Sequence, residues 1–363
     1  MQENKIYCID VLQGLKKLDD ESIDCIVTSP PYWALRDYNS SKQIGLEDNP
    51  QDYINKIVEI MKECKRVLKP NGTIWLNLGD SYYSKTGNEN TSSFLKNHRL
   101  PKNIRGKFKS NWLQHKQRLL IPFRIAIKCQ DELGLILRNN ITWVKQWSNF
   151  KDKNSAGSSL PCSIQDRLNT NSETIFFFVK NPKYFFDLDS VKIPCRTLEL
   201  KGKDKNPGDC IVFPLEPSKE KHFAMFPPTL PEFCIKAGCP ELICKKCGKP
   251  QLIRKSGGNS NAFNIRIRDV QKGRIKSIDR KASKKETENY NEKNYISKEK
   301  QKIILDCNCK AGFESGIVLD PFMGSGTTAL VARKFGRNFI GFDVNKDYTK
   351  IAKKRLLKHE RGN

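Results

Sequence analysis

The sequence predicts an α/β fold whose strands form a mostly parallel sheet. Short, continuous apolar runs such as Ile23–Val27 and Ile317–Asp320 are typical of parallel strands that are buried on both faces. Segments with helical apolar spacing alternate with these runs, as they do in βαβ units. At 363 residues the chain can form one large domain of this kind plus an insertion.

The predicted elements alternate along the chain. Apolar runs predict strands at Lys5–Ile9, Ile23–Val27, Thr73–Leu78, Ile136–Val144, Ser172–Val179, Ile317–Asp320 and Asn338–Phe342. Helical spacing predicts helices at Val11–Leu18, Tyr53–Leu68, Leu119–Leu133, Thr229–Ala237 and Asn345–Leu357, and another that begins at Thr327. Residues 195–222 are expected to be irregular. The last helix should lead back to the first strand, so that both ends of the chain build one sheet.

The stretch Thr28–Trp33 is the first candidate functional site. It follows a predicted strand, which its two prolines end because proline donates no backbone hydrogen bond. Open α/β sheets bind their ligands at the carboxyl ends of the strands. The stretch offers the Ser29 hydroxyl, proline carbonyls and two aromatic rings, a set that can hold a flat heterocycle and accept hydrogen bonds from its amino group. A surface turn with incidental aromatic residues is the alternative.

A glycine-containing turn after Asp320 is the second candidate site. Gly324 and Gly326 allow the backbone to approach a ligand closely, and a helix follows from Thr327. The next strand ends at Asp343, about 20 positions on, where sheets of this kind carry a carboxylate that binds ribose. No lysine follows Gly326, which excludes a Walker phosphate loop.

These two stretches resemble the amino-methylating DNA methyltransferases, which methylate the exocyclic amine of cytosine or adenine. Thr28–Trp33 is similar to their catalytic motif, in the serine form associated mainly with cytosine N4, and Asp320–Thr328 is similar to their S-adenosylmethionine (AdoMet) loop. The catalytic motif comes first, as in the circularly permuted beta class. The resemblance covers most of residues 5–238 and 313–358. It implies a Rossmann-like AdoMet-dependent methyltransferase fold with a mostly parallel, seven-stranded sheet.

The resemblance also implies roles for individual residues. The catalytic residues would be Ser29, Pro30, Pro31 and Tyr32, with Ser29 and Pro30 accepting hydrogen bonds from the amine and Tyr32 stacked on a flipped base. The residues that bind AdoMet would be Asp10, Phe226, Pro227, Asp320, Pro321, Phe322, Gly324, Gly326, Thr327 and Asp343. Asp10 would serve equally well as the N-cap of the helix that follows it.

The charge of the chain favours a polyanionic partner. Lys and Arg number 65 against 40 Asp and Glu, which gives a formal net charge of +25. Residues 83–118 lose apolar periodicity and interleave basic with aromatic side chains, which is typical of a nucleic-acid groove and also compatible with a solvated loop. The residues expected to contact double-stranded DNA are Trp33, Arg36, Arg99, Arg105, Lys109 and Lys116.

The cysteines indicate a metal site. There are 13 of them without an export signal, which argues for reduced thiols rather than a disulfide framework. Cys244 and Cys247 have CxxC spacing, Cys307 and Cys309 form a CxC pair, and four thiolates suit tetrahedral zinc. Cys239 is a spare ligand candidate, and free cysteines in a loop are the alternative.

The cysteines also suggest the domain organisation. We expect residues 239–312 to be a zinc-ribbon-like insertion with a flexible basic loop. It would interrupt a catalytic methyltransferase domain of residues 1–238, which residues 313–363 complete with the AdoMet-binding part.

Three functions remain open from the sequence. The first is site-specific methylation of cytosine N4 in duplex DNA, in a restriction–modification or phage-type context with a cognate restriction enzyme as a candidate partner. The second is adenine N6 methylation on the same scaffold, whose members usually carry Asp or Asn where Ser29 stands. The third is a catalytically silent DNA-binding protein, which the intact Ser29, Tyr32, Gly324, Gly326 and Asp343 disfavour.

The hydropathy of the chain bears on its location. No apolar run of about 18 residues is present, and the N-terminus lacks the apolar core of a signal peptide. We therefore expect a cytoplasmic protein without a membrane partner.

Overall fold

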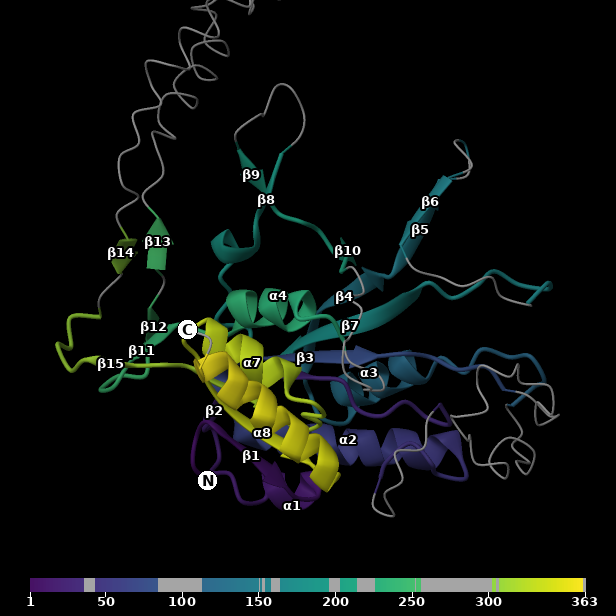
Figure 1. The fold of residues 1–363 in the computed structure, drawn as a ribbon, viewed down its shortest axis with the longest axis horizontal. Helices are drawn as coiled ribbons and strands as arrows, with labels where there is room; N and C mark the ends of the chain where they lie inside the picture. Colours follow the sequence, from purple (N-terminus) through teal and green to yellow (C-terminus); the bar gives the residue numbers. More distant parts are fainter. Residues whose placement is uncertain are drawn as a thin grey trace, which may run out of the picture.

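An eight-stranded sheet forms the centre of the computed structural model, which describes residues 1–35, 43–83, 113–149, 151, 154–157, 164–195, 203–213, 226–251, 253–255, 302–304 and 307–361 (Figure 1). The strand order is β1-β17-β16-β2-β3-β7-β4-β10. Strand β7 runs antiparallel to both of its neighbours, and the other pairs are parallel. The strands are β1 (Lys5–Cys8), β2 (Ile23–Thr28), β3 (Leu68–Leu78), β4 (Ile136–Val144), β7 (Ser172–Val179), β10 (Cys210–Val212), β16 (Ile317–Asp320) and β17 (Asn338–Asp343). The predicted α/β fold with a mostly parallel sheet is confirmed.

Strand β10 is the one member of this sheet that the sequence did not indicate. It lies within the segment expected to be irregular, and it pairs parallel with β4 at the sheet edge. The Trp143 indole of β4 donates a hydrogen bond to the carbonyl of Phe213, just after β10, at 2.9 Å. The apolar run Cys210–Phe213 is short and lies within a charged segment, so its pattern does not separate a strand from a loop.

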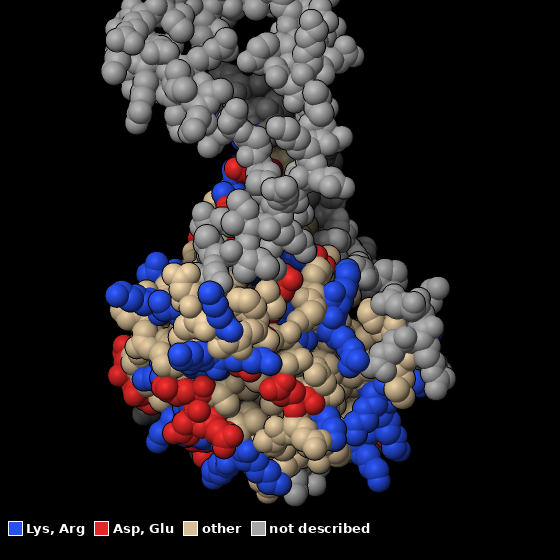
Figure 2. Space-filling view, turned by 90° about the vertical axis from the view of Figure 1, so that its left-hand side faces the viewer, with Lys and Arg blue, Asp and Glu red and all other residues tan. Residues whose placement is uncertain are grey.

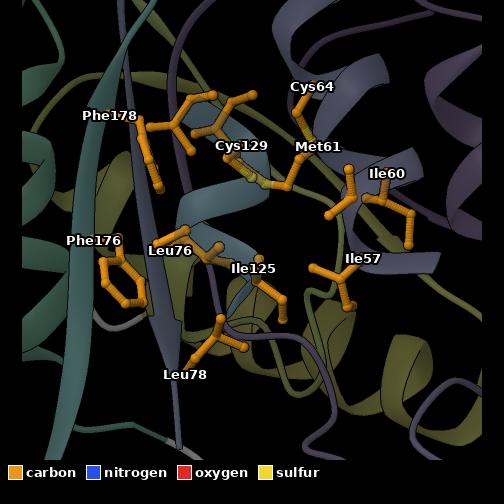
Figure 3. Packing of buried hydrophobic residues seen from close by; sticks show 14 of the residues in the cluster. Ile57, Ile60, Met61, Cys64, Leu76, Leu78, Ile125, Cys129, Phe176 and Phe178 are labelled. Atoms are coloured by element: carbon orange, nitrogen blue, oxygen red, sulfur yellow. The ribbon is translucent and has the colours of Figure 1, made fainter. Parts of the chain in front are cut away.

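Three helices of the described part of the chain cover each face of the sheet, because side chains alternate between the two faces of a strand. Helices α1 (Val11–Leu15), α2 (Pro50–Val67) and α3 (Ile121–Asp131) pack in one apolar cluster, and α4 (Thr229–Gly238), α7 (Thr327–Lys334) and α8 (Lys346–Arg361) pack in the other. On β7, Phe176 and Phe178 face the first cluster while Phe177 faces the second. Figure 3 shows Phe176 and Phe178 opposite the apolar side chains of α2 and α3.

Side-chain caps fix where several helices begin. The Asp10 carboxylate accepts hydrogen bonds from the backbone N–H groups of Leu12 (3.0 Å) and Gln13 (3.2 Å) and so caps α1. The Asn49 side chain caps α2 in the same way, and Pro50 occupies the first helical position. The Asn345 side chain accepts from Asp347 N at 2.8 Å at the start of α8. The predicted helices are confirmed, with ends that shift by a few residues to these caps.

The two ends of the chain join in the sheet, as the sequence predicted. Strand β1, near the N-terminus, pairs in parallel with β17, near the C-terminus, from Lys5 opposite Ile340 to Cys8 opposite Asp343. Strand β16 in turn lies between β17 and β2. The carboxyl ends of β2 and β16 therefore meet at one edge of the sheet, although they are almost 300 positions apart in the sequence.

Smaller sheets lie outside the central one. Strands β11 (Leu242–Cys244), β12 (Pro250–Gln251) and β15 (Phe313–Glu314) form a three-stranded sheet, beside which β13 (Ile253–Lys255) pairs with β14 (Lys302–Ile304). Two further ribbons pair β5 (Gln146–Asn149) with β6 (Asn154–Gly157), and β8 (Ile193–Pro194) with β9 (Asp204–Lys205), after the short helix η2 (Asp189–Val191). Among the described residues, no helix has the length and apolar character needed to span a membrane.

Candidate active site

The two candidate loops lie side by side at the carboxyl edge of the sheet. Val318 and Leu319 of β16 pair with Cys25 and Ile26 of β2, so the loops that follow the two strands leave the sheet together. The Thr28 hydroxyl donates a hydrogen bond to Asp320 Oδ1 at 2.8 Å and links the end of one strand to the end of the other. A ligand in the crevice between these strands would touch both loops.

Asp320 is the buried centre of this junction. Its Oδ1 also accepts from the N–H of Phe322 at 3.0 Å, and its Oδ2 accepts from the Thr328 hydroxyl at 2.6 Å. Burial raises the pKa of the Asp320 carboxyl to about 6, although the hydrogen bonds from Thr328 and Thr28 act in the opposite direction and lower it. These contacts make Asp320 the residue that holds the glycine turn on the strand ends.

The glycine turn has the backbone conformation that the sequence suggested. Gly324 has φ +53° and Gly326 has φ +85°, a region that favours glycine. A Cβ on Gly326 would lie 2.8 Å from the Ala352 Cβ of α8, whereas a Cβ on Gly324 would meet nothing within 4 Å. The turn is therefore packed on one side, and beside Gly324 it has open space in which the backbone can approach a ligand.

Asp343 holds the same turn from the end of β17. Its Oδ2 accepts from Gly324 N at 2.8 Å and its Oδ1 accepts from Asn345 N at 2.7 Å, while burial raises the pKa of this carboxyl. Each carboxylate oxygen can accept more than one hydrogen bond, so the geometry leaves capacity for a ligand hydroxyl. A contact with ribose stays a prediction.

The other residues predicted to bind AdoMet lie around this edge. Asp10 follows β1, where it caps α1. Pro321 is buried and Phe322 half-buried in the loop after β16, and Thr327 begins α7. Phe226 packs against the apolar cluster that includes α4, and the Pro227 carbonyl accepts a hydrogen bond from Leu230 N at 3.0 Å at the start of that helix.

The Thr28–Trp33 loop, the predicted catalytic loop, is organised by a hydrogen-bond network that joins three strands. The Tyr32 hydroxyl donates to Glu173 Oε2 at 2.7 Å, and the Ser29 hydroxyl donates to the Tyr32 oxygen at 3.3 Å. The Asn77 amide nitrogen lies 2.9 Å from the Tyr32 oxygen, 3.0 Å from Glu173 Oε2 and 3.3 Å from Ser29 Oγ. Burial, followed by the Glu173 charge, raises the pKa of Tyr32, which keeps its hydroxyl protonated.

Tight packing also supports the loop from behind. The Tyr53 hydroxyl of α2 donates to the Pro31 carbonyl at 2.8 Å. The Trp33 indole donates to the Glu47 carbonyl at 2.9 Å, and the Trp33 side chain is only 3% exposed. This position corrects the expectation that Trp33 contacts DNA, since a buried ring supports the loop from inside. The sequence places two aromatic rings, Tyr32 and Trp33, side by side and does not show which of them turns inward.

Gly79 supports this loop, a role that the sequence did not suggest for it. It follows β3, and a Cβ at this position would lie 2.5 Å from Tyr32 Cε2, a distance that real Cβ atoms essentially never show. The Tyr32 ring thus rests directly on the Gly79 backbone. A glycine at the carboxyl end of a strand beside the catalytic loop was the available signal.

Comparisons with known proteins agree with this arrangement. A family model described as DNA methylase, that of the N6 and N4 methyltransferases, matches residues 23–248 and 259–354. The chain belongs to this family. It is therefore a DNA methyltransferase that takes its methyl group from AdoMet, and the third function left open, a catalytically silent DNA-binding protein, loses its support.

Individual relatives cover the chain to different extents. The methyltransferase is 29% identical over 359 residues to the Type II methyltransferase M.SmaI of Serratia marcescens, with 98% of this chain and 91% of that protein aligned. It is 38% identical over 193 residues to the Type II methyltransferase M.SfiI of Streptomyces fimbriatus, where 53% of this chain and 39% of the relative are aligned.

Solved structures share the fold at low sequence identity. The PvuII DNA methyltransferase, described as cytosine-N4-specific, superposes with a TM-score of 0.53 at 17% identity, over 99% of this chain and 92% of the other. A putative DNA modification methylase from Thermus thermophilus, solved with S-adenosyl-L-methionine, gives a TM-score of 0.52 at 16% identity, over 99% and 95%. These two likenesses support the methyltransferase fold.

Only some of the residues expected to bind DNA are among the described residues. Arg36, Arg99, Arg105 and Lys109 lie outside the described residues. Lys116 is described and exposed, and it forms an ion pair with Asp166 at 2.5 Å. Figure 2 shows one face of the molecule, on which basic and acidic side chains are mixed, as is typical of a solvated surface.

The four predicted zinc ligands come together in the methyltransferase. The sulfur atoms of Cys244, Cys247, Cys307 and Cys309 all lie within 4.8 Å of one another. Zinc bound by four thiolates at about 2.3 Å would place them about 3.8 Å apart, so the cluster fits the ion. Gly248, with φ +67°, allows the turn after the CxxC pair, and its N–H donates to the Cys244 carbonyl at 2.9 Å. Cys239 is buried outside this cluster, so it is not the spare ligand that the sequence suggested.

Proposed function

We propose that this methyltransferase transfers the methyl group of AdoMet to the exocyclic N4 amine of cytosine in double-stranded DNA, at a specific sequence. The observation that carries the proposal is the position of Ser29. Its neutral hydroxyl lies at the end of β2, beside the AdoMet loop after β16, and Asn77 and Tyr32 hold it in place. The fold shared with a cytosine-N4-specific enzyme agrees with this assignment.

The proposed reaction depends on making the amine nucleophilic. The lone pair of the cytosine amine is delocalised into the ring, and hydrogen-bond acceptors on its two hydrogens draw the nitrogen toward a tetrahedral shape. Ser29 Oγ and the Pro30 carbonyl are the two acceptors, and among the described residues no donor bonds that carbonyl. Tyr32 offers its half-buried ring as a surface on which the flipped base stacks.

The proposed cofactor site is the crevice after β16 and β17. AdoMet supplies the methyl group on its sulfonium. Gly324 and Gly326 provide the close backbone approach and Asp343 the ribose contact, while Asp320 holds the loop. Asp10, Phe226, Pro227, Pro321, Phe322 and Thr327 complete the proposed site around these residues.

No thiol is needed in this mechanism. Burial raises the pKa of Cys25 to about 12 and that of Cys129 to about 12, so neither provides a thiolate at neutral pH. The amine attacks the methyl group directly, with positioning and electrostatics supplied by the protein.

Two further elements belong to the proposal. A structural zinc on Cys244, Cys247, Cys307 and Cys309 would hold together a small sheet that has little core of its own. Residues 239–312 would then form the insertion, and residues 1–238 with 313–363 the catalytic domain. The relatives described as Type II methyltransferases support a restriction–modification role and a cognate restriction enzyme as partner.

Expression in a host that lacks DNA methylation tests the proposal in cells. Sequencing with modified-base detection should show N4-methylcytosine at one recurrent sequence, and a Ser29→Ala variant should leave the same DNA unmodified. Modified adenine at a recurrent sequence would instead establish the N6 activity that the scaffold also supports.

A further inference from the structure

Glu173 is a half-buried carboxylate with no role in the methyl transfer proposed above. It lies on β7, opposite Trp143 of β4, and its side chain is 14% exposed. The polar groups that the structure places against it, among the described residues, come from three elements: Tyr32 from the catalytic loop, Asn77 from β3 and Lys145 just after β4. A carboxylate with this many partners is held in one orientation.

The hydrogen bonds through Glu173 have a consistent direction. The Ser29 hydroxyl donates to the Tyr32 oxygen, and the Tyr32 hydroxyl donates to Glu173 Oε2. Asn77 donates from its amide nitrogen, although its own buried oxygen then has no partner among the described residues. With one lone pair facing Asn77 and its proton facing Tyr32, Ser29 Oγ keeps one lone pair for the substrate amine.

We propose that Ser29, Tyr32 and Glu173 form a relay that removes the proton released by methyl transfer, with Glu173 as its acceptor. The amine nitrogen forms a bond to the methyl carbon as the carbon–sulfur bond breaks, and the electron pair of that bond goes to the sulfur. The nitrogen, now positively charged, passes a proton to Ser29 Oγ. The Ser29 proton moves to the Tyr32 oxygen and the Tyr32 proton to Glu173 Oε2, so the product is a neutral methylated amine.

Glu173 touches no reacting atom in this scheme, and it acts as a positioning residue through Tyr32 and Ser29. Lys145 is its counter-ion and also lies 4.7 Å from the centroid of the Trp143 ring, so the cation is fixed in place. The Glu173 side chain is thereby held where it can accept a proton from Tyr32. The relay rests on the proposed use of Ser29, and it applies to the amine of cytosine or of adenine.

Single-turnover rates at saturating AdoMet and DNA, measured across pH, test this relay. In the wild type the rate should fall at low pH, because a relay that is already protonated cannot accept the released proton. Glu173→Gln should slow methyl transfer by at least about tenfold, within the range of a lost proton acceptor, and should abolish this acidic limb while AdoMet affinity stays within about twofold. Glu132→Gln is the matched control, because Glu132 pairs with Lys128 on α3 away from the loop, and it should behave as the wild type.

Lys145→Met provides a readout that a purely structural role would not move. Without its cation, a carboxylate takes up a proton at higher pH, so the acidic limb should shift upward in pH. This variant also keeps the test decisive if Glu173→Gln does not fold. A wild-type rate and pH profile in Glu173→Gln, or an unchanged limb in Lys145→Met, would overturn the relay. Mass spectrometry of the product identifies the methylated base separately, so failure of the cytosine assignment would not be confused with failure of the relay.

Discussion

Gly79→Ala should cripple the catalytic loop without touching the cofactor site. The new Cβ would lie 2.5 Å from Cε2 and 2.8 Å from Cδ2 of Tyr32, whereas ordinary carbon contacts are about 3.5–4.0 Å. The ring must therefore retreat by roughly 1 Å. Such a movement is enough to break the 2.7 Å hydrogen bond from Tyr32 to Glu173, and a misplacement of this size can cost about 100-fold in rate.

A double-mutant cycle isolates this effect. Turnover of Gly79→Ala on duplex DNA should fall by about 10- to 100-fold, with AdoMet affinity by calorimetry within about twofold of wild type, because β2 separates β3 from β16. In a Tyr32→Ala background the added methyl meets no ring, so Gly79→Ala should cost little more. Equal losses in both backgrounds, or full activity of Gly79→Ala, would refute the account of how Tyr32 is held.

Four other outcomes follow from the same structure. Asp343→Ala should weaken AdoMet binding by about 1–3 kcal/mol in calorimetry, because the Gly324 and Asn345 N–H groups lose their acceptor; unchanged affinity would remove Asp343 from the site. Metal analysis of purified protein should give about one zinc per chain, and a variant with both Cys244 and Cys307 changed to Ser should lose this ion. Active protein free of metal would contradict this. Ser29→Ala should reduce turnover and leave AdoMet affinity nearly unchanged, because the lost acceptor acts on the reacting amine; a selective loss of AdoMet binding would argue otherwise. Burial raises the Asp320 pKa from 3.8 to about 6. The stability that the protonated carboxyl contributes is therefore full below about pH 4 and is lost as the pH rises through about 6. The free energies of unfolding of wild type and Asp320→Asn, measured by urea titration, should diverge in this window by up to about 3 kcal/mol, and parallel curves would contradict this.

The fold was predictable because its strands are buried. Ile317–Leu319 and Ile175–Val179 are continuous apolar runs, and the structure has strands at Ile317–Asp320 and Ser172–Val179 with the bounds that the sequence predicts. The sequence also predicted that the last helix leads back to the first strand, and the structure joins the two ends of the chain by pairing β1 with β17. Strand β10 escaped detection because its three apolar residues form too short a run, within a charged segment, to indicate a strand.

The site was predictable only where one stretch carries the chemistry. The Ser29 loop and the Gly324 turn are local motifs, and the structure places them side by side. The contact of Tyr32 with Glu173 spans 141 positions and depends on β7 lying next to β3, which no local pattern specifies. The inward direction of Trp33 likewise depends on the Glu47 carbonyl that receives its indole N–H.

The identity of the methylated atom is the most direct test of the account. DNA methylated in vitro by the purified protein should be digested to nucleosides and analysed by mass spectrometry, with Ser29→Ala as the matched control. The neutral Ser29 hydroxyl and the Pro30 carbonyl predict N4-methylcytosine, strongly reduced in the variant. N6-methyladenine in its place would show that a serine at position 29 does not select cytosine, and methylation at cytosine C5 would contradict a mechanism without a cysteine nucleophile.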